Sequence, residues 1–322
     1  MSSPSTPLPT RRIGDGPDAL EVSVVGLGCN NFGWRLDLDG TQAVLDAALS
    51  AGITLFDTAD VYGGSGGSES LMGEALAGRR DEFLIATKFG MDMGEGAPDV
   101  ARGSREYARW AVEGSLRRLR VDRIDLLYYH IPDGVTPLAE TLAALDELVA
   151  EGMVRWIGCS NFNAAELDEA ATIARERGSA RFVALQNEYS LLERSIEAEV
   201  QPACERLDVA ILPYFPLASG LLSGKYGRDE EAPAGARLRG REVVGTDAQF
   251  DVIEDLAEFA SARGVGMIDV AIGALAAQPQ VASVIAGATK PEQIEANVAA
   301  AAWVPSAEDL AEIDRIAPTQ RR

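Results

Sequence analysis

The strongest constraint on this chain is a regular alternation between short apolar runs and amphipathic helical patterns along nearly the whole sequence. The apolar runs lie at 23–29, 53–59, 82–90, 125–130, 154–161, 182–190, 209–217 and 281–288. Helical patterns follow the first six of them, near 40–51, 68–77, 104–119, 137–151, 164–177 and 195–206. Nearly continuous apolar runs of this length are typical of parallel strands buried on both faces. The alternation therefore predicts a parallel sheet whose strands are joined by helices.

The order of these units favours one barrel over two domains. A chain of 322 residues has the length of two average domains or of one large α/β barrel. Beyond the N-terminal tail there is no Pro/Ser-rich linker and no change of composition. We therefore expect 1–322 to form a single (β/α)8 TIM barrel, with 1–10 as a flexible tail and 11–22 as a short hairpin or cap. A long loop at 218–247 follows the seventh strand, and extra helices follow it near 248–263 and 267–277.

Local signals mark the start of two helices. Asn163 with Glu166, and Thr289 with Glu292, have the spacing of a capping box. Pro291 falls near the first turn of the second of these helices, where its missing N–H costs nothing.

Composition excludes several classes of partner. The formal net charge of -21 argues against nucleic acid and against anionic membranes, because both require a basic surface. Three scattered cysteines do not make a disulfide framework, so a reducing compartment such as the cytoplasm is expected. With a single histidine in the chain, no metal site built on histidine is expected either.

Four polar residues follow three neighbouring strands at their carboxyl ends, where the active site of such a barrel lies. Asp57 ends the second strand, with Tyr62 five residues later in FDTADVYG. Lys88 ends the third strand, and His130, the only histidine, ends the fourth. Taken singly, each has an ordinary structural interpretation. Together, all four fall at the predicted active face.

The chemistry of these four side chains suits proton donation. A tyrosine is a poor acid at neutral pH, and a nearby ammonium is expected to lower its pKa by roughly 1–3 units. Asp57 would keep Lys88 charged against the cost of burial. His130 would hydrogen-bond the same substrate oxygen. Strand alternation further predicts that Tyr128 and His130 point into the barrel while Tyr129 packs outward under a helix.

The chain resembles the aldo-keto reductase superfamily, NADPH-dependent reductases built on a (β/α)8 barrel. The motifs FDTADVYG, GGSESLMGEAL, IATKFG, DLLYYH, GCSNF, QNEYS, YFPLASGLLSGKY and GATKPEQIEANV occur in the family's order. The resemblance implies that Asp57, Tyr62, Lys88 and His130 are the catalytic tetrad, with Tyr62 as the general acid. The implied reaction reduces an aldehyde or ketone to an alcohol.

The same resemblance implies a cofactor site for NADPH. Ser160, Asn161 and Gln186 are expected to hold the nicotinamide carboxamide, and Tyr214 to stack on its ring. The remaining implied cofactor residues are Leu217, Ser219, Gly220, Lys225 and Arg237 on the seventh-strand side and Gly287, Thr289, Lys290, Gln293 and Asn297 on the eighth. Ala296 stands where the family commonly has Glu, and Lys290 is left as the partner for a 2′-phosphate. NADH therefore remains possible as a cofactor.

Substrate and partner predictions are coarser. Asn30, Trp34 and Met91 are the candidate pocket residues, which suggest an aromatic-lined entrance for a small carbonyl substrate. The loop at 218–247, with Lys225, Arg237, Arg239 and Arg241, is interpreted as a clasp for the cofactor pyrophosphate. A monomer and a homo-oligomer stay equally open.

Two other functions remain alternatives. A barrel hydrolase would require a second carboxylate at the mouth, for which Glu188 is the weak candidate. A nucleotide-binding regulatory subunit would be favoured if a catalytic position were lost, and all four positions are occupied.

Overall fold

The structure, a computed structural model, describes residues 8–228, 230–233, 237–239 and 245–319. Its centre is an eight-stranded parallel sheet in the order β10-β3-β4-β5-β6-β7-β8-β9. The strands are β3 (Val25–Gly28), β4 (Leu55–Asp57), β5 (Leu84–Phe89), β6 (Ile124–Tyr129), β7 (Val154–Ser160), β8 (Phe182–Gln186), β9 (Ala210–Ile211) and β10 (Val284–Gly287). Parallel bridges between Ile211 and Val281 and between Tyr214 and Ile285 bring the last strand to the seventh. The (β/α)8 barrel is therefore confirmed.

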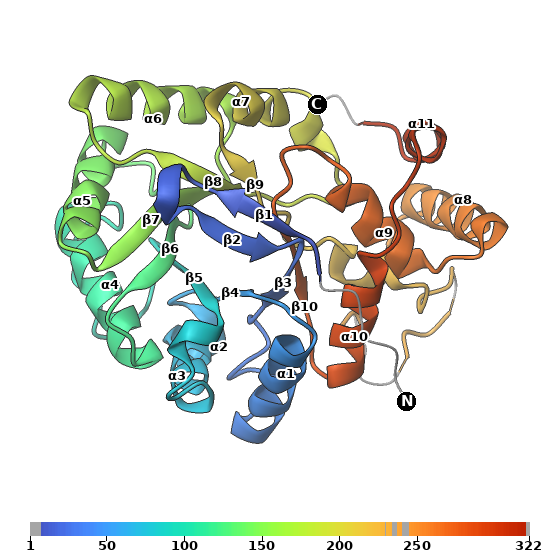
Figure 1. The fold of residues 1–322 in the computed structure, drawn as a ribbon, viewed down its shortest axis with the longest axis horizontal. Coiled ribbons are helices and arrows are strands. Elements are labelled where there is room, and N and C mark those ends of the chain that lie inside the picture. Colours follow the sequence, from blue (N-terminus) through green and yellow to red (C-terminus); the bar gives the residue numbers. More distant parts are fainter. Residues whose placement is uncertain (1–7, 229, 234–236, 240–244, 320–322) are drawn as a thin grey trace.

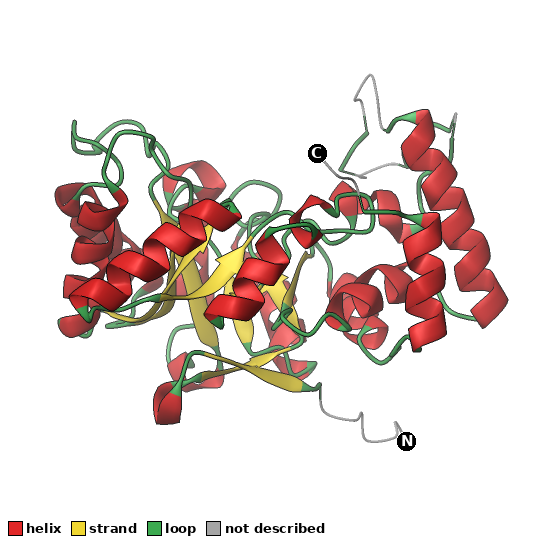
Figure 2. Cartoon of the chain, turned by 90° about the horizontal axis from the view of Figure 1, so that it is seen from above, coloured by secondary structure: helices red, strands yellow, loops and turns green. Residues whose placement is uncertain are grey.

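Helices surround this sheet on its outer face (Figure 1). They are α1 (Leu38–Ser50), α2 (Tyr62–Ser65), α3 (Gly67–Ala75), α4 (Arg105–Leu119), α5 (Leu138–Ala150), α6 (Ala164–Arg177), α7 (Val200–Leu207) and α10 (Pro291–Ala300). Helix α9 (Met267–Ala276) packs beside α10 against the barrel core, and two further helices, α8 (Asp247–Arg263) and α11 (Ala307–Ile316), lie to one side of the barrel (Figure 2). Short 3-10 turns are η1 (Gly16–Asp18), η2 (Arg80–Glu82), η3 (Ser195–Glu197) and η4 (Ala218–Ser223).

An antiparallel hairpin of β1 (Thr10–Ile13) and β2 (Leu20–Ser23) packs against the end of the barrel opposite the strand carboxyl ends (Figure 1). This confirms the hairpin expected at 11–22. Ile13, Leu20 and Val22 are buried against the barrel interior. Because β1 begins at Thr10, the last residue of the expected tail is part of a strand. Residues 1–7 lie outside the described part of the chain.

Several predicted boundaries shift. The helix expected at 195–206 divides into η3 and α7, and the strand expected at 209–217 pairs as β9 over two residues only. Asn163 and Glu166 form the predicted capping box. The box expected from Thr289 and Glu292 is wrong, because Lys290 is the N-cap of α10. Gln293 Oε1 instead accepts from the Thr289 N–H at 2.7 Å.

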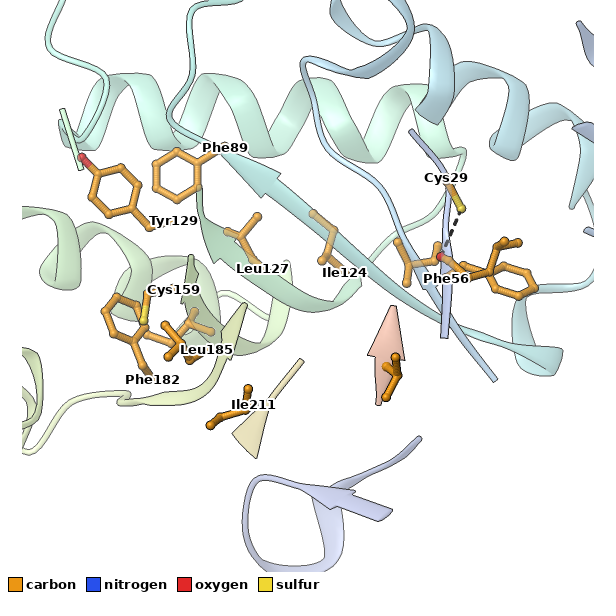
Figure 3. Packing of buried hydrophobic residues seen from close by; sticks show 14 of the residues in the cluster. Cys29, Phe56, Phe89, Ile124, Leu127, Tyr129, Cys159, Phe182, Leu185 and Ile211 are labelled. Carbon is orange, nitrogen blue, oxygen red and sulfur yellow. Dashed lines mark hydrogen bonds between the residues drawn. The ribbon is translucent and has the colours of Figure 1, made fainter. Parts of the chain in front are cut away.

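The core follows the strand alternation. Tyr128 is fully buried among residues inside the barrel, whereas Tyr129 belongs to the layer between sheet and helices. Figure 3 shows Tyr129 beside Phe89 in that layer, where their rings stack with centroids 5.3 Å apart. The prediction that Tyr128 points inward and Tyr129 outward is confirmed. The same alternation applies to β5. Phe89 packs outward against Tyr129, so Lys88, the residue before it, points toward the barrel interior.

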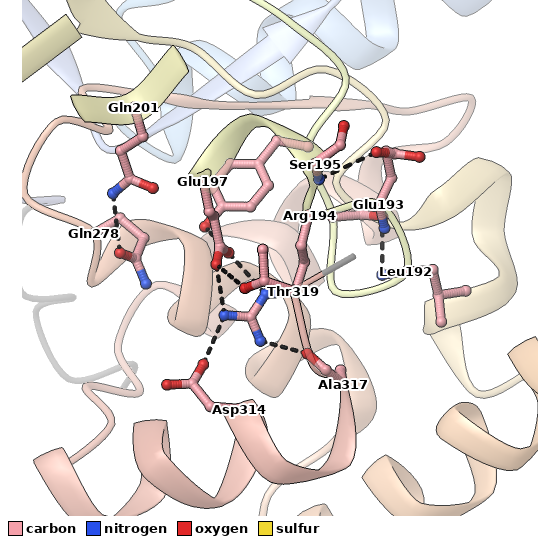
Figure 4. A network of polar contacts seen from close by, with 12 residues as sticks. Leu192, Glu193, Arg194, Ser195, Glu197, Gln201, Gln278, Asp314, Ala317 and Thr319 are labelled. Atoms are coloured by element: carbon pink, nitrogen blue, oxygen red, sulfur yellow. Dashed lines mark hydrogen bonds and ion pairs between the residues drawn. The ribbon is translucent and has the colours of Figure 1, made fainter. Parts of the chain in front are cut away.

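A polar network fastens the C-terminal segment to the loop after β8 (Figure 4). Arg194, whose side chain is 7% exposed, donates to Glu197, to Asp314 of α11 and to the carbonyl of Ala317. Thr319 donates to the second oxygen of Glu197 at 2.8 Å. A nearly buried guanidinium with four hydrogen bonds to this network holds the segment in position.

Among the described residues, no single helix is long and apolar enough to cross a membrane. Helices α8 and α9 reach that length and hydropathy only as a pair, bent by 93° at the break between them.

Candidate active site

The four predicted catalytic residues come together at the carboxyl ends of three adjacent strands. Asp57 is the last residue of β4, Lys88 lies near the end of β5, and His130 directly follows β6. Strand β5 pairs with both β4 and β6, so the three strand ends are neighbours. Tyr62 opens the short helix α2, which follows β4.

Asp57 and Lys88 form a buried ion pair. Lys88 Nζ lies 2.7 Å from Asp57 Oδ2, and the side chains are 1% and 5% exposed, respectively. Lys88 Nζ also donates to the carbonyl of Thr58 at 2.7 Å. Burial acts to lower the pKa of Lys88, but Asp57 and Tyr62 outweigh it and raise that pKa above its ordinary value. Lys88 therefore stays charged, as expected from the sequence.

A glycine fixes the position of Tyr62. Gly63 has a φ of +70°, and a Cβ there would lie 2.6 Å from both the Phe32 carbonyl oxygen and the Ser68 nitrogen. Only glycine therefore fits directly after Tyr62. The resulting turn places the ring centroid of Tyr62 5.0 Å from Lys88 Nζ and 6.0 Å from the ring of His130, edge to face.

The acidity of Tyr62 differs from the expectation. Burial raises the pKa of Tyr62 above its ordinary value, and the charge and hydrogen bonding of Lys88 offset only part of that rise. The expected net lowering is therefore wrong, because the cost of desolvating a phenolate exceeds the attraction of one ammonium. A neutral phenol that keeps its proton remains a donor at physiological pH.

His130 is neutral over the physiological range. Burial lowers the pKa of His130 to about 3, and the charge of Lys88 adds to this. Its Nδ1 is buried and has no hydrogen-bond partner among the described residues. A neutral imidazole carries one N–H donor and one acceptor nitrogen, which suits binding a substrate oxygen without adding charge.

A cavity of about 560 Å³ opens beside these groups. Asp57, Tyr62 and His130 line it, while Lys88 lies behind them. Most of the other predicted site residues also line it, namely Asn30, Met91, Ser160, Asn161, Gln186, Tyr214, Leu217, Ser219, Gly220, Lys225, Arg237, Gly287, Thr289, Gln293 and Asn297. The tertiary structure thus gathers into one cavity residues from all along the chain.

Residues 24–318 match the model of the aldo/keto reductase family. The chain belongs to this family. "Probable aldo-keto reductase 1" of Glycine max is 36% identical over 312 residues, covering 94% of this chain and 88% of the relative. "L-glyceraldehyde 3-phosphate reductase" of Escherichia coli (strain K12) is 32% identical over 314 residues, covering 93% and 90%. "Probable voltage-gated potassium channel subunit beta" of Oryza sativa subsp. japonica is 34% identical over 303 residues, covering 90% of each chain.

A solved structure gives the same result. The holo form of an aldo-keto reductase from Bacillus halodurans superposes with a TM-score of 0.81 at 30% identity, covering 98% of both chains. Membership of the aldo/keto reductase family supports carbonyl oxidoreductase activity with a nicotinamide cofactor.

Two predicted residues of this aldo/keto reductase lie away from the cavity. Trp34 is 63% exposed and does not line it, so the expected aromatic entrance lacks this ring. Its neighbour Arg35 stacks over it at 4.9 Å and itself lines the cavity. Lys290 is exposed at the N-cap of α10 and is not among the lining residues.

Arg35 is a basic residue that lines the cavity and was not predicted from the sequence. It lies in the loop after β3. Burial lowers the pKa of Lys225, another lining residue, and the charge of Arg35 adds to this. A signal was present, because Arg35 is a basic residue just beyond a strand end in an acidic chain. Arg237 lies at the same cavity, with its guanidinium 4.9 Å above the ring of Phe215. Arg241, also predicted for this loop, lies outside the described residues.

Hydrogen bonds join the amide side chains of the cavity to the predicted catalytic residues. Gln186 Nε2 donates to Asp57 Oδ1 at 2.7 Å, and Asn161 Nδ2 donates to the carbonyl of His130 at 3.0 Å. The Tyr214 hydroxyl donates to Asn161 Oδ1 at 2.9 Å. These bonds connect the predicted carboxamide-binding residues directly to the predicted catalytic ones.

Two further expectations bear on other functions. Glu188, the second carboxylate considered for a hydrolase, is exposed and is not among the cavity-lining residues. Within the described part of the chain, no group of three or more His, Cys, Asp or Glu side chains is placed to hold a metal ion.

Proposed function

We propose that this aldo/keto reductase reduces an aldehyde or ketone to an alcohol with NADPH, and that Tyr62 is the proton donor. The observation that carries the proposal is the contact of one half-buried phenol with a charged lysine and a neutral histidine at the edge of a cavity. A proton donor facing a polarised oxygen is what carbonyl reduction requires of the protein.

The cavity fits a nicotinamide dinucleotide in its chemistry. Its volume of about 560 Å³ is in the range of ligand pockets. Arg35, Lys225 and Arg237 supply positive charge for phosphate groups, and Asn161 Oδ1, which accepts from the Tyr214 hydroxyl, has a second lone pair to accept from an amide. Gly287 is exposed to the cavity, and a Cβ there would lie 3.4 Å from the side chains of Asn30 and Asn31. A glycine therefore leaves room for a ligand to approach the backbone.

The protein's own groups have separate tasks in the proposed reaction. The bound cofactor supplies a hydride to the carbonyl carbon. Tyr62 donates its phenolic proton to the carbonyl oxygen, and His130 positions that oxygen through its N–H. Lys88 stabilises the phenolate that remains on Tyr62, and Asp57 holds Lys88 charged and in place. Gln186 fixes Asp57 through its other carboxylate oxygen.

A second candidate is a nucleotide-binding regulatory subunit. It is favoured by one observation, the 34% identity to a relative named as a potassium channel subunit beta. All four tetrad positions are nonetheless occupied and in contact, which supports catalysis. The expected site of action is the cytoplasm, in keeping with three cysteines that are all free and buried.

A turnover assay separates the two candidates. The protein would be mixed with NADPH or NADH and a panel of aldehydes, ketones and phosphorylated aldehydes, and loss of the reduced nicotinamide followed by absorbance. Turnover of any carbonyl above the uncatalysed rate supports the reductase. Tight NADPH binding by calorimetry without turnover of any panel member would instead support the regulatory subunit.

A further inference from the structure

A second group of buried charged side chains lies behind the Asp57–Lys88 pair, on the face of β5 turned toward helices α3 and α4. Asp60 and Glu69 are both 0% exposed. Thr87 precedes Lys88 in β5 and therefore points to the opposite face, where its hydroxyl donates to Glu69 Oε1 at 2.6 Å. Arg118 of α4 approaches Glu69 Oε2 to 2.7 Å. The proposed reaction has no use for this group.

Within the group, both carboxyl oxygens of Glu69 have polar partners, whereas those of Asp60 have no hydrogen-bond partner among the described residues. One oxygen of Glu69 accepts from Thr87 and the other pairs with Arg118. Neither carboxyl oxygen of Asp60 has a hydrogen-bond partner of normal geometry among the described residues. Burying a carboxylate without a partner costs far more free energy than burying a neutral carboxylic acid. The site therefore favours the protonated form of Asp60.

The surroundings of Asp60 as a whole raise its pKa, with burial as the largest cause. Burial raises the pKa of Asp60 to about 8, with the Glu69 carboxylate as the second cause, while Arg118, the Val61 N–H and Lys88 lower it. Tyr107 of α4 also faces Asp60, and the pKa of this phenol is raised by burial and by Asp60, so it adds no charge near neutral pH. Glu69 already engages Arg118, and Asp57 engages Lys88, so no cation is left for Asp60 alone.

Asp60 belongs to the segment that carries Tyr62. Its backbone N–H donates to the carbonyl of Lys88 at 3.1 Å, and the Thr58 N–H donates to the carbonyl of Ala86 at 2.9 Å. Tyr62 follows two residues later, with its own N–H donating to the Ala59 carbonyl at 3.2 Å. A charge formed on Asp60 favours a movement of this segment toward water, because burial opposes the charge. Such a movement would carry Tyr62 away from Lys88 and His130.

We propose that Asp60 is a positioning residue, and that its carboxyl must carry a proton for the 58–62 segment to hold Tyr62 in the active site. The kinetic part of this inference rests on the proposed reductase function. The structural part, a buried carboxylic acid that is neutral in the folded protein, does not.

The structural part is tested by stability against pH, which needs no activity. Asp60→Asn keeps the shape and removes the titration, and Asp122→Asn makes the same change at an exposed position. In the unfolded chain Asp60 ionises near pH 4, whereas in the folded chain it keeps its proton to about pH 8. Wild-type stability should therefore fall relative to Asp60→Asn as pH rises from 4 to 8, and the difference should level off above 8. Urea unfolding between pH 5 and 9.5 measures it.

The kinetic part is tested by the pH profile of turnover. Wild-type kcat should decline with a midpoint near pH 8 and approach a tenfold loss per further pH unit. In Asp60→Asn this decline should be absent, and Asp122→Asn should behave as wild type. Binding of NADPH should change less than twofold with pH in all three proteins, because Asp60 does not line the cavity. The titration of Tyr62 itself cannot produce this midpoint, since its pKa lies above its ordinary value.

A spectroscopic measurement covers the case in which Asp60→Asn fails to fold. Infrared difference spectra of the wild type between pH 7 and 9 should show the loss of one protonated buried carboxyl. If this spectral change is absent, or if the stability difference between wild type and Asp60→Asn is constant with pH, the proposal that Asp60 is neutral in the folded protein is wrong. If that carboxyl is present but both proteins have the same pH profile of kcat, the positioning role is wrong. If the protein shows no turnover, urea unfolding and the infrared spectra still decide whether Asp60 is neutral, so failure of the reductase proposal is distinguished from failure of this one.

Discussion

Lys88 and Asp57 stand 2.7 Å apart across two adjacent strands, with both side chains almost completely removed from water. Each charge is stable there only because the other is present, since removing one partner leaves an uncompensated buried ion. The pair therefore links the stability of the barrel to the electrostatics around Tyr62.

Asp57→Asn tests this link. It should reduce the free energy of unfolding by about 3–5 kcal/mol, because Lys88 loses its anionic partner, and the pKa of Lys88 should fall. Turnover should be lost together with stability. Urea denaturation measures the first effect. The control is Asp46→Asn, which removes the half-exposed partner of Arg79 and should cost within about 1 kcal/mol. An equal loss of unfolding free energy in the two variants would show that the buried Asp57–Lys88 pair stabilises the fold no more than an exposed ion pair does.

Tyr62→Phe should lower kcat by about 100-fold or more, because it removes the proton donor and little else. Nucleotide binding, followed by quenching of tryptophan fluorescence, should persist. Tyr189→Phe loses the same hydroxyl at the contact with Glu197, away from the cavity, and should keep wild-type turnover. Near-normal turnover in Tyr62→Phe would exclude Tyr62 as the acid.

The single histidine permits a direct titration. The pKa of His130 is lowered to about 3, below the value near 6.5 of the unfolded chain, so the unfolded state takes up a proton that the folded state refuses. Stability should therefore fall as pH drops from about 6.5 toward 3, and this fall should shrink in His130→Gln. The imidazole resonances in the folded protein should not titrate between pH 5 and 8 by NMR. A midpoint near 6.5 would mean that His130 is hydrated rather than buried.

Lys290→Ala should weaken NADPH binding about tenfold or more, which corresponds to roughly 1.5–3 kcal/mol for a hydrogen bond between charged groups, and leave NADH nearly unchanged. Arg35→Gln is the competing variant, because Arg35 lines the cavity and Lys290 does not. Calorimetry measures the affinity of each of the two variants for NADPH and for NADH, relative to wild type. Selective loss of NADPH in Arg35→Gln alone would move the 2′-phosphate contact from Lys290 to Arg35.

Limited proteolysis tests the proposed clasp at 218–247. Trypsin should cut the free protein near Arg237–Arg241, and saturating NADP+ should block the cut, because Arg237 lines the cavity that the cofactor is proposed to fill. Cleavage at Arg12, on the hairpin at the other end of the barrel, is the internal reference. The same rate of cleavage near Arg237 in both states would make the segment a plain connector.

Much of the fold was determined by the sequence itself. Runs such as DLLYYH are apolar on both faces, and only a parallel strand between helices and a barrel interior buries both. The same alternation predicts that Tyr128 and Tyr129 face opposite sides. Helix α11 was missed, although Ser306 and Asp309 form a capping box, because its apolar pattern is weak and its position depends on contacts such as that of Asp314 with Arg194.

The site divides in the same way. Asp57, Lys88 and His130 could be predicted because strand ends of a barrel necessarily meet at one face. The acidity of Tyr62, the exposure of Trp34 and the contribution of Arg35 could not, because each depends on how much water the finished structure excludes. The lack of a hydrogen-bond partner for the Asp60 carboxyl among the described residues could not be predicted for the same reason. Sequence supplies a side chain's chemistry and its place along the strand, but desolvation is a property of all the atoms around it, and only the tertiary structure decides that.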